Sequence, residues 1–399
     1  MGNYTTVDPD YSDRANWSLG YRTDLKDILP NRGLLTSMLD SGYIRKQEHP
    51  SEPLWIFNYT EKATFDRVWN TATKACRGLI VDYTDYTVVA RGMQKFFNHN
   101  EPDAPRISAD EEVYVTDKMD GSLGIRYWQP RAKRWAIATR GSFMSDQAIH
   151  ATAKFDEILN GYHHFELEDS RITHLYEIIY PGNRIVLDYG DKDTLVCIGG
   201  VWHSTGEYVP VSRHNRDMIL ESGFEATEIL PASTFAEALA LPDRKNAEGI
   251  VVLTAGNPQR MVKVKQSDYV AMHRTISHLS AKVIWERAAN GETLDQIKWG
   301  MPEELWGFIE TTYEELSEQH EQYIRAAITT HDAITSKLHA SWGKYGWGRK
   351  EYAKEAVKYT YRDLLFLLLD ERDIGPVVWK KIKPEGDGRP FRQTSEDVA

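Results

Sequence analysis

The sequence is poor in cysteine, with only Cys76 and Cys197 among 399 residues. Two cysteines so far apart form neither a disulfide framework nor a metal-ligand spacing. It also lacks long apolar runs: the longest, LLFLLL at residues 364–369, is far shorter than the roughly 20 residues of a membrane-spanning helix. The N-terminal stretch MGNYTTVDPD is polar and has no secretory signal pattern. We therefore expect a cytoplasmic protein with no membrane partner.

Positive charge is also scarce, because 48 Lys and Arg residues stand against 59 Asp and Glu residues, for a formal net charge of -11. This balance disfavours a protein that coats nucleic acid in bulk, since such proteins are usually basic. It does not exclude an enzyme with a local basic cleft, because the potential depends on where the charges lie. The length of 399 residues is enough for two domains with cores of their own.

The stretch TDKMDGSLGIR, residues 116–126, carries the first chemical signal. One predicted strand ends there and another leaves, which puts Lys118 at a strand end, where a sheet can direct it into a pocket. A free lysine has a pKa of about 10.4, so roughly 1 in 2,500 is unprotonated at pH 7. Covalent chemistry at Lys118 therefore requires nearby cations or a metal to depress its pKa. The alternative is an ordinary hairpin turn, in which Asp120 and Gly121 serve only backbone geometry.

Four further positions place a charge beside a predicted strand. Arg77 precedes an apolar strand, Lys95 precedes the Phe96-Phe97 pair, Arg140 follows a strand, and Glu177 lies within one. Each alone has a structural explanation, as a surface arginine, an aromatic core pair or an edge-strand carboxylate. Together, cations for phosphate oxygens and an aromatic face for a purine are the residue types of a nucleotide pocket.

A last strand pair carries Glu248 at the head of EGIVVLT, and Lys263 and Lys265 on MVKVK. By the two-residue period of a strand, both ammonium groups project from the same face. Like charges side by side repel each other, so a bound anion explains the pair; an exposed basic edge strand is the alternative.

A change in composition near residues 277–281 predicts two domains, 1–276 and 277–399. Beyond it strand signals vanish, and helices are predicted over about 302–342, as one helix or two with a bend, and about 349–370. Residues 337–392 carry 13 Lys and Arg against 8 Asp and Glu, interleaved with aromatics. This segment could form a surface that contacts RNA, or its aromatics could form a core while its charges form a solvated face, and the sequence leaves both alternatives open.

In this order the motifs resemble the covalent nucleotidyltransferase superfamily of DNA ligases, RNA ligases and messenger-RNA capping enzymes. The RG strand, KFFN, KMDG, the Lys-x-Lys strand followed by DYVAMH, and the helical tail look like the RNA ligase 1 family of T-even bacteriophages. The resemblance implies an α+β fold. Residues 1–276 would form an adenylyltransferase domain with ATP-grasp-like antiparallel sheets and helices, and 277–399 an all-α domain that binds RNA, including tRNA.

The resemblance also implies a role for each residue. Lys118 attacks the α-phosphorus of ATP, within a turn that includes Gly121. Lys263 and Lys265 would hold the α-phosphate and help keep Lys118 unprotonated. Arg77 and Lys95 would bind the other phosphates, and Phe97 would flank the adenine. Asp120, Glu177 and Glu248 would order Mg²⁺ or Mn²⁺ through water, or contact the ribose. Arg140 stands where a lysine is expected, and Tyr269 matches the family pattern without an assigned role.

The implied reaction is ATP-dependent joining of RNA 5′-phosphate and 3′-hydroxyl ends by a monomer, with cleaved tRNA as the expected substrate. A phage enzyme of this kind would act in the host cytoplasm. A DNA ligase or capping guanylyltransferase shares the lysine but normally adds a small β-barrel after the Lys-x-Lys strand. A non-catalytic RNA-binding relative would lack one of Lys118, Glu248, Lys263 or Lys265, and all four are present.

Overall fold

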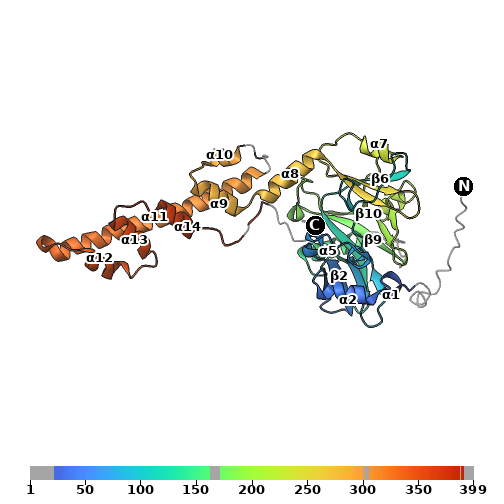
Figure 1. Cartoon of the computed structure of the whole chain (residues 1–399), viewed down its shortest axis with the longest axis horizontal. Helices are drawn as coiled ribbons and strands as arrows, with labels where there is room; N and C mark the ends of the chain where they lie inside the picture. The colour runs from blue at the N-terminus through green and yellow to red at the C-terminus, as the bar shows by residue number, and fades with distance from the viewer. Residues whose placement is uncertain (1–21, 162–170, 300, 302–304, 387, 391–399) are drawn as a thin grey trace, which may run out of the picture. The chain divides into compact units, whose positions relative to one another are not determined.

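The computed structural model describes residues 22–161, 171–299, 301, 305–386 and 388–390. These residues form two compact units that divide between Val270 and Ala271, within helix α8 (Ser267–His278). The sequence placed the domain boundary six residues later, in the same helix. Figure 1 shows the strands gathered in unit 1, coloured blue to yellow, and only helices in orange and red beyond α8. None of the helices in the described ranges combines the length and hydropathy that a membrane span requires.

The first sheet of unit 1 is antiparallel and has the strand order β1-β2-β3-β4. Its strands are β1 (Ile44–Glu48), β2 (Leu54–Tyr59), β3 (Arg77–Asp82) and β4 (Val88–Ala90), and its helices are α1 (Leu25–Ile28), α2 (Arg32–Asp40), α3 (Glu61–Phe65) and α4 (Thr71–Ala75). Leu79 and Val81 of β3 pack against Ala72 and Ala75 of α4 in one core cluster. Because Arg77 is the first residue of β3 and follows α4 closely in the chain, this packing fixes its position at the start of the strand.

The second sheet has the order β11-β10-β9-β7-β8, with β12 parallel to β10. Its strands are β7 (Ser122–Gln129), β8 (Arg134–Ala138), β9 (Ile172–Ile179), β10 (Thr194–Trp202), β11 (Tyr208–Pro210) and β12 (Glu225–Ala226). Helix α5 (Asp146–Gly161) packs Ala151 and Phe155 on one face, in a cluster that also includes α6 (Arg216–Glu221). The opposite face shares a core with the first sheet through Ile125 and Ile80.

The third sheet has the order β5-β14-β13-β6 and carries four of the motif residues, Phe97, Lys118, Lys263 and Lys265. Its strands are β5 (Phe97–Asn98), β6 (Val113–Lys118), β13 (Gly249–Thr254) and β14 (Met261–Lys265), and α7 (Phe235–Leu239) packs on it. Gly249 pairs with Lys118 on one side and with Lys265 on the other. The register therefore aligns two of the motif lysines across one strand.

The structure excludes one alternative that the sequence left open in unit 1, and it corrects one strand prediction. Strands β6 and β7 flank the KMDG turn but belong to different sheets, so the turn is a crossing between sheets and not a hairpin. The apolar residues of the segment after β9, RIVLDYG, predict a strand, and this prediction is wrong, because the chain forms the short helix η1 (Pro181–Asn183) and then a loop. The backbone N–H groups of Val186 and Leu187 bond to the carboxylate of Asp120 and not to a neighbouring strand.

Unit 2 is helical throughout its described residues, so the predicted α+β fold with an all-helical tail is confirmed. Its elements are α9 (Ala281–Ala289), α10 (Leu294–Lys298), α11 (Trp306–Trp342), η3 (Gly343–Tyr345), α12 (Arg349–Ala356), α13 (Arg362–Leu369) and α14 (Gly375–Lys381). The predicted helix over about 349–370 is wrong as a single element, because residues 357–361 separate α12 from α13. Tyr352 is fully buried and Trp342 is 44% exposed, so the aromatics divide between core and surface.

Candidate active site

An ion triad at the end of the third sheet joins three of the motif residues. Lys118 Nζ lies 2.6 Å from Glu248 Oε2, and Lys265 Nζ lies 2.9 Å from Glu248 Oε1. The Glu248 side chain is 3% exposed, whereas Lys118 and Lys265 are 21% and 25% exposed. The buried carboxylate therefore holds two lysines whose ammonium groups remain partly accessible from outside.

The backbone at Gly249 makes this triad possible. Its φ of +154° and its close approach to β14 exclude a side chain, because a Cβ would lie 2.1 Å from the Val264 carbonyl oxygen. Lys118 and Lys265 stand on either side of this glycine in the register. The pair Glu248-Gly249 thus places a carboxylate between two lysines on neighbouring strands.

The protonation of Lys118 differs from the sequence-based expectation. Burial acts to lower the pKa of Lys118, but Glu248, Glu177 and Asp120 outweigh it, and the net shift is upward from the usual value. The expectation that neighbouring lysines depress this pKa is therefore wrong for the free protein. Burial also acts to raise the pKa of Glu248, but the two lysines bonded to it lower it overall. The triad is stable as two ammonium groups on one carboxylate.

Lys263 has the opposite electrostatic environment. Burial, followed by the charges of Lys118, Lys265 and Lys95, holds the pKa of Lys263 well below its usual value. Its ammonium nitrogen lies 5.8 Å from the centre of the Phe96 ring. A lysine with this surplus of neighbouring positive charge is suited to bind an anion that enters the site.

Glu177 reaches the KMDG turn from the second sheet. Its Oε1 accepts a 3.0 Å hydrogen bond from the backbone N–H of Gly121. A Cβ on Gly121 would lie 2.6 Å from the Ile178 carbonyl oxygen, so the turn can approach β9 only with glycine there. Burial first, and then the nearby carboxylates, raise the pKa of Glu177 to about 8. The side chain is therefore largely protonated at neutral pH in the free protein.

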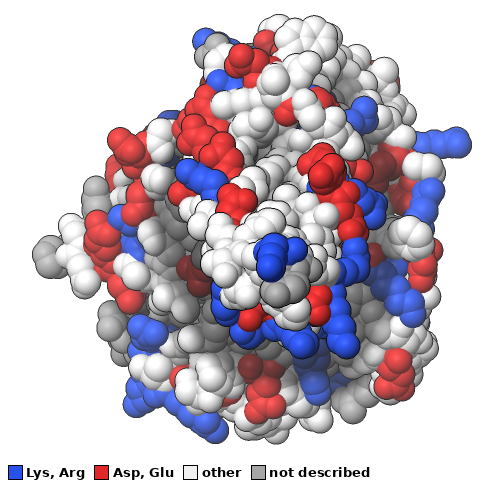
Figure 2. Space-filling view, turned by 90° about the vertical axis from the view of Figure 1, so that its left-hand side faces the viewer, with Lys and Arg blue, Asp and Glu red and all other residues white. Residues whose placement is uncertain are grey.

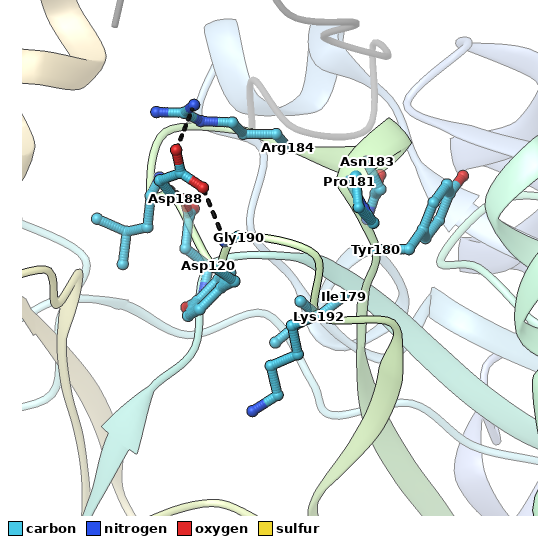
Figure 3. A pocket seen from close by; sticks show the side chains of 11 residues that line it. Asp120, Ile179, Tyr180, Pro181, Asn183, Arg184, Asp188, Gly190 and Lys192 are labelled. Atoms are coloured by element: carbon cyan, nitrogen blue, oxygen red, sulfur yellow. Dashed lines mark hydrogen bonds and ion pairs between the residues drawn. The ribbon is translucent and has the colours of Figure 1, made fainter.

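Asp120 holds the turn to two other segments. Its Oδ2 accepts the N–H groups of Val186 and Leu187 at 2.9 and 2.8 Å, and its Oδ1 accepts the Tyr269 hydroxyl at 2.7 Å. Figure 3 shows Asp120 beside the loop that carries Arg184 and Asp188, at a cavity of about 160 Å³. The contacts of Asp120 favour a positioning role, and they give Tyr269, which the sequence left without a role, a place at the site.

The described residues contain no preformed group of three or more metal-binding side chains. Both oxygens of Glu248 bind lysines and both oxygens of Asp120 accept hydrogen bonds. Glu177 uses one oxygen for the Gly121 N–H. These contacts do not fit a cage of protein ligands; they are compatible with a hydrated ion such as Mg²⁺, which keeps several of its waters.

A second group of cations surrounds Tyr59 at the boundary of the first and third sheets. Arg140 Nη1 donates to the Tyr59 hydroxyl at 3.2 Å, and Lys95 Nζ lies 5.5 Å from the Tyr59 ring centre. Burial acts to raise the pKa of Tyr59, but Arg140, Arg77 and Lys95 lower it overall. Burial, aided by the charge of Arg140, lowers the pKa of Arg77, while Tyr59 and Glu177 act to raise it. Three predicted phosphate-binding residues thus lie together, with Tyr59 among them.

The two phenylalanines of KFFN have different environments. Phe97 is 3% exposed and packs edge-on against Trp69 at 5.6 Å between ring centres. Phe96 is half-buried, with the Arg77 guanidinium 5.9 Å and the Lys263 ammonium 5.8 Å from its ring centre. The predicted contact of Phe97 with adenine does not fit its burial, and Phe96 is the ring that lies among the cations.

Sequence reasoning missed Tyr59, Trp69 and Tyr189 as neighbours of the site. Tyr189 accepts the backbone N–H of Asp120 at 3.0 Å, and Tyr59 and Trp69 contact Lys95 through their rings. No local pattern marks them, because Tyr59 lies at a strand end and the other two lie in loops. The aromatic run PLWIFNYT, which ends just after Tyr59, was the only available signal.

The acidic total charge does not appear as a uniformly acidic surface. Figure 2 shows lysine and arginine side chains interleaved with aspartate and glutamate over the visible face. The basic groups of the site gather locally within a chain whose net charge is -11. Local concentration of cations, and not total charge, governs the binding of a charged ligand.

Comparison with known proteins gives these residues a context. Residues 75–269 match the model of the RNA ligase family. A putative bifunctional polynucleotide kinase/RNA ligase of Autographa californica nuclear polyhedrosis virus is 26% identical over 276 residues, which cover 63% of this chain and 38% of that protein. This chain thus aligns with well under half of that relative.

Two further proteins are similar over more of the chain. An uncharacterized protein, ORF64, of Ostreid herpesvirus 1 is 25% identical over 340 residues, or 77% of this chain and 82% of that protein. An archaeal ATP-dependent RNA ligase structure has a TM-score of 0.41 and 14% identity, covering 85% of this chain and 77% of that one. The matched segment 75–269 contains the ion triad and the three cations Arg77, Lys95 and Arg140, whereas Tyr59 precedes it.

Proposed function

Because residues 75–269 belong to the RNA ligase family, we propose that this protein joins RNA 5′-phosphate and 3′-hydroxyl ends with ATP, through a covalent lysyl-AMP at Lys118. The observation that carries the proposal is the ion triad, in which Glu248 holds Lys118 and Lys265 at 2.6 and 2.9 Å. Lys263, with its lowered pKa, lies among the same charges. One lysine is positioned to react, and two are placed to bind the phosphate that it attacks.

In the first step, the Lys118 amine forms a bond to the α-phosphorus of ATP, and the bond to pyrophosphate breaks. The amine loses a proton and pyrophosphate leaves with the electron pair of the broken bond. Lys263 and Lys265 stabilise the charge on the non-bridging oxygens. Arg77, Lys95 and Arg140 bind the departing phosphates. A hydrated divalent ion that enters with ATP would supply positive charge beside Glu177 and Glu248, which favours the neutral amine.

In the second step, an oxygen of the RNA 5′-phosphate attacks the same phosphorus and the phosphorus–nitrogen bond breaks. Lys118 recovers the electron pair and takes a proton, and the RNA carries a 5′-to-5′ pyrophosphate-linked adenylate. In the third step, an RNA 3′-hydroxyl loses its proton and attacks the 5′-phosphorus, which expels AMP. The turn held by Asp120 and Glu177 keeps Lys118 at this position throughout.

The RNA substrate is proposed to be a cleaved tRNA, and unit 2 is proposed to bind it. Unit 2 is helical over its described residues and exposes Trp299, Trp342 and Tyr359 by 85%, 44% and 38%. Lys337 and Lys344 are exposed near Trp342 in the sequence. Exposed rings beside cations are the residue types that bind single-stranded RNA.

A DNA ligase or a capping guanylyltransferase is the main alternative. Both share the lysine chemistry but normally carry a β-barrel after the Lys-x-Lys strand, and among the described residues no strand follows β14. The family match of residues 75–269 also favours RNA ligation.

The covalent step is tested with purified protein, a divalent metal and α-labelled ATP or GTP, followed by a denaturing gel. We expect label from ATP on the natural chain and none on Lys118→Ala. Lys46→Ala is the matched control, because Lys46 is an exposed lysine on β1 whose ammonium lies over Trp55. Its labelling should equal that of the natural chain.

Mass spectrometry of the untreated protein accompanies the gel, since a preparation that already carries AMP would not label. Label from GTP and not from ATP would favour the capping alternative. Absence of both label and an AMP mass increment in the folded natural chain would reject the proposed function.

A further inference from the structure

A second concave surface of unit 1, the lysine cleft, adjoins the cation group of the candidate active site. It has a volume of about 610 Å³. Its lining comes from Lys74, the segment 93–97, the turn 205–208 between β10 and β11, and the turn 257–261 between β13 and β14, with Asp103, Pro105 and Leu253. Lys95 and Phe96 belong to both the cleft and the surroundings of the site.

Two lysines lie side by side on one wall of the cleft. The backbone N–H of Lys95 donates to the Lys74 carbonyl at 3.0 Å, and the two ammonium groups lie 5.4 and 5.9 Å from the Phe97 ring centre. Among the described residues, no carboxylate lies within 4.0 Å of either ammonium group. Glu101 acts on Lys95 only from beyond ion-pair distance, and two adjacent cations without a close carboxylate among the described residues indicate an anionic ligand.

The acidic residues of the lining have partners other than the two lysines. Asp103 forms a 2.8 Å ion pair with Arg67, and Glu207 accepts the Thr205 hydroxyl at 3.2 Å. Arg260 of the opposite wall is likewise paired, with Glu111. Lys74 and Lys95 are therefore the cations of the lining that remain for a ligand.

The distance from Lys118 suits the start of a nucleic-acid strand. Gly249 pairs with Lys118, and Leu253, which lines the cleft, lies four residues along the same strand. At about 3.3 Å per residue, this separation is roughly 13 Å. The first nucleotides of a single strand whose end lies at Lys118 can reach the cleft.

The stereochemistry of phosphoryl transfer gives the direction of that strand. In-line attack by Lys118 requires pyrophosphate to leave from the opposite side of the α-phosphorus. In the second step, the RNA 5′-phosphate must attack opposite Lys118, from the side that pyrophosphate vacated. Arg77 and Lys95, which bind pyrophosphate first, then face the RNA 5′-phosphate. Lys95 itself lines the lysine cleft, so a strand whose 5′-phosphate faces Lys95 can continue into the cleft.

We propose that the lysine cleft binds the RNA strand that carries the 5′-phosphate. Lys74 contacts its first internucleotide phosphate, next to the 5′-phosphate that Lys95 faces, and the half-buried Phe96 ring contacts a terminal base. This assignment rests on the proposed function, because it gives one substrate of the ligation reaction its place on unit 1.

The test separates the two steps of the reaction. Full-length protein is adenylylated with ATP, freed of nucleotide and mixed with a 5′-phosphorylated oligoribonucleotide, and the formation of RNA-adenylate is followed over one turnover. The variants are Lys74→Gln and Gln94→Glu, with Lys46→Gln as the matched control. Gln94 is exposed on the cleft wall, so the second variant adds a negative charge of nearly the same shape.

We expect Lys74→Gln and Gln94→Glu to raise the RNA concentration for half-maximal rate about fivefold or more, with no change in self-adenylylation. Loss of one phosphate contact should also reduce the slope of log affinity against log salt by about 0.7 for Lys74→Gln. A merely structural effect would leave that slope unchanged. Lys46→Gln should match the natural chain in both measurements.

Two results would overturn the inference while leaving the proposed function intact. One is an unchanged RNA dependence and salt slope in both cleft variants, with normal self-adenylylation. The other is an altered concentration dependence for ATP without an effect on RNA, which would assign the cleft to the phosphates of ATP. Failure of the natural chain itself to self-adenylylate would instead reject the proposed function, and the inference with it.

Discussion

At the scale of single residues, Glu248 determines the resting state of the site. Its carboxylate bonds to Lys118 and Lys265 and is almost fully buried. Removal of either lysine would leave part of a buried charge without its partner, which is costly. The same carboxylate, with Glu177 and Asp120, raises the pKa of Lys118 against the effect of burial. The free protein therefore holds the reactive lysine in place but keeps it protonated.

This protonation predicts a pH dependence for self-adenylylation. Only the neutral amine reacts, and the pKa of Lys118 in the free protein lies above its usual value of 10.5. The apparent second-order rate constant kcat/KM for ATP should therefore rise about tenfold per pH unit between pH 6 and 9, since kcat/KM reports the free enzyme.

The measurement is the initial rate of labelling at ATP concentrations well below saturation, in buffers of constant ionic strength. Glu177→Gln is the informative comparison, because Glu177 ionises near pH 8 and adds negative charge beside Lys118. A plateau below pH 8 in both proteins would contradict a raised pKa of Lys118.

At the scale of elements, the KMDG turn joins two different sheets. Strand β6 ends at Lys118 in the third sheet, and β7 begins at Ser122 in the second. Three side chains from distant segments hold the turn: Glu177 from β9, Tyr189 from the following loop and Tyr269 from α8. The turn thus depends on both sheets for its position, and packing changes there should affect reactivity and stability together.

Gly121→Ala tests this dependence. The new Cβ would lie 2.6 Å from the Ile178 carbonyl oxygen and 3.0 Å from Glu177 Cγ, so the turn must move away from β9. Overpacking of this kind costs about 1–3 kcal/mol. We expect a lower urea midpoint and at least a tenfold slower self-adenylylation.

Gly256→Ala is the matched control, because a Cβ at Gly256 in the turn between β13 and β14 meets no atom within 4 Å. It should change the midpoint of unfolding little. Equal behaviour of the two variants would show that the close approach of Gly121 to β9 has no energetic consequence.

At the scale of the whole molecule, the chain combines a sheet-rich unit and a helical unit. All the residues of the candidate site, from Arg77 to Tyr269, belong to unit 1. Unit 2 has clusters of its own, one around Leu364 and Val378 and another around Leu338 and Tyr352. The chemistry of the lysine and the proposed binding of tRNA are therefore assigned to separate units.

A chain shortened after residue 280 tests this division. It keeps every residue of the ion triad and of the cation group, so we expect self-adenylylation within about twofold of the full-length rate. Sealing of nicked tRNA should fall at least tenfold, because the proposed RNA-binding surface is removed. Sealing of a short single-stranded RNA serves as the control substrate. Equal rates of tRNA sealing in both proteins would contradict a role of unit 2 in binding tRNA.

Sequence reasoning was most successful where local patterns report local structure. Alternating residues predicted the strands that carry Lys118 and Lys263 and the strand that follows Glu248, and helical periodicity predicted the all-helical unit 2. Sequence reasoning failed where contacts between distant segments determine the local structure. The stretch RIVLDYG has the apolar content of a strand, but Asp120 binds its backbone N–H groups, and residues 349–370 break into two helices. No pattern distinguished the exposure of Phe96 from that of Phe97.

The sequence by itself determined which reactive groups the protein has and in what order, because residue types and spacings are properties of the chain. That order sufficed to show the resemblance to the RNA ligase family, whose model matches residues 75–269. Only the tertiary structure decided the electrostatic state of those groups, because a pKa depends on distances between segments more than a hundred residues apart. Glu248 raises the pKa of Lys118 where cations alone would lower it. The lysine cleft likewise exists only because the turns at 205–208 and 257–261 fold beside Lys74 and Lys95.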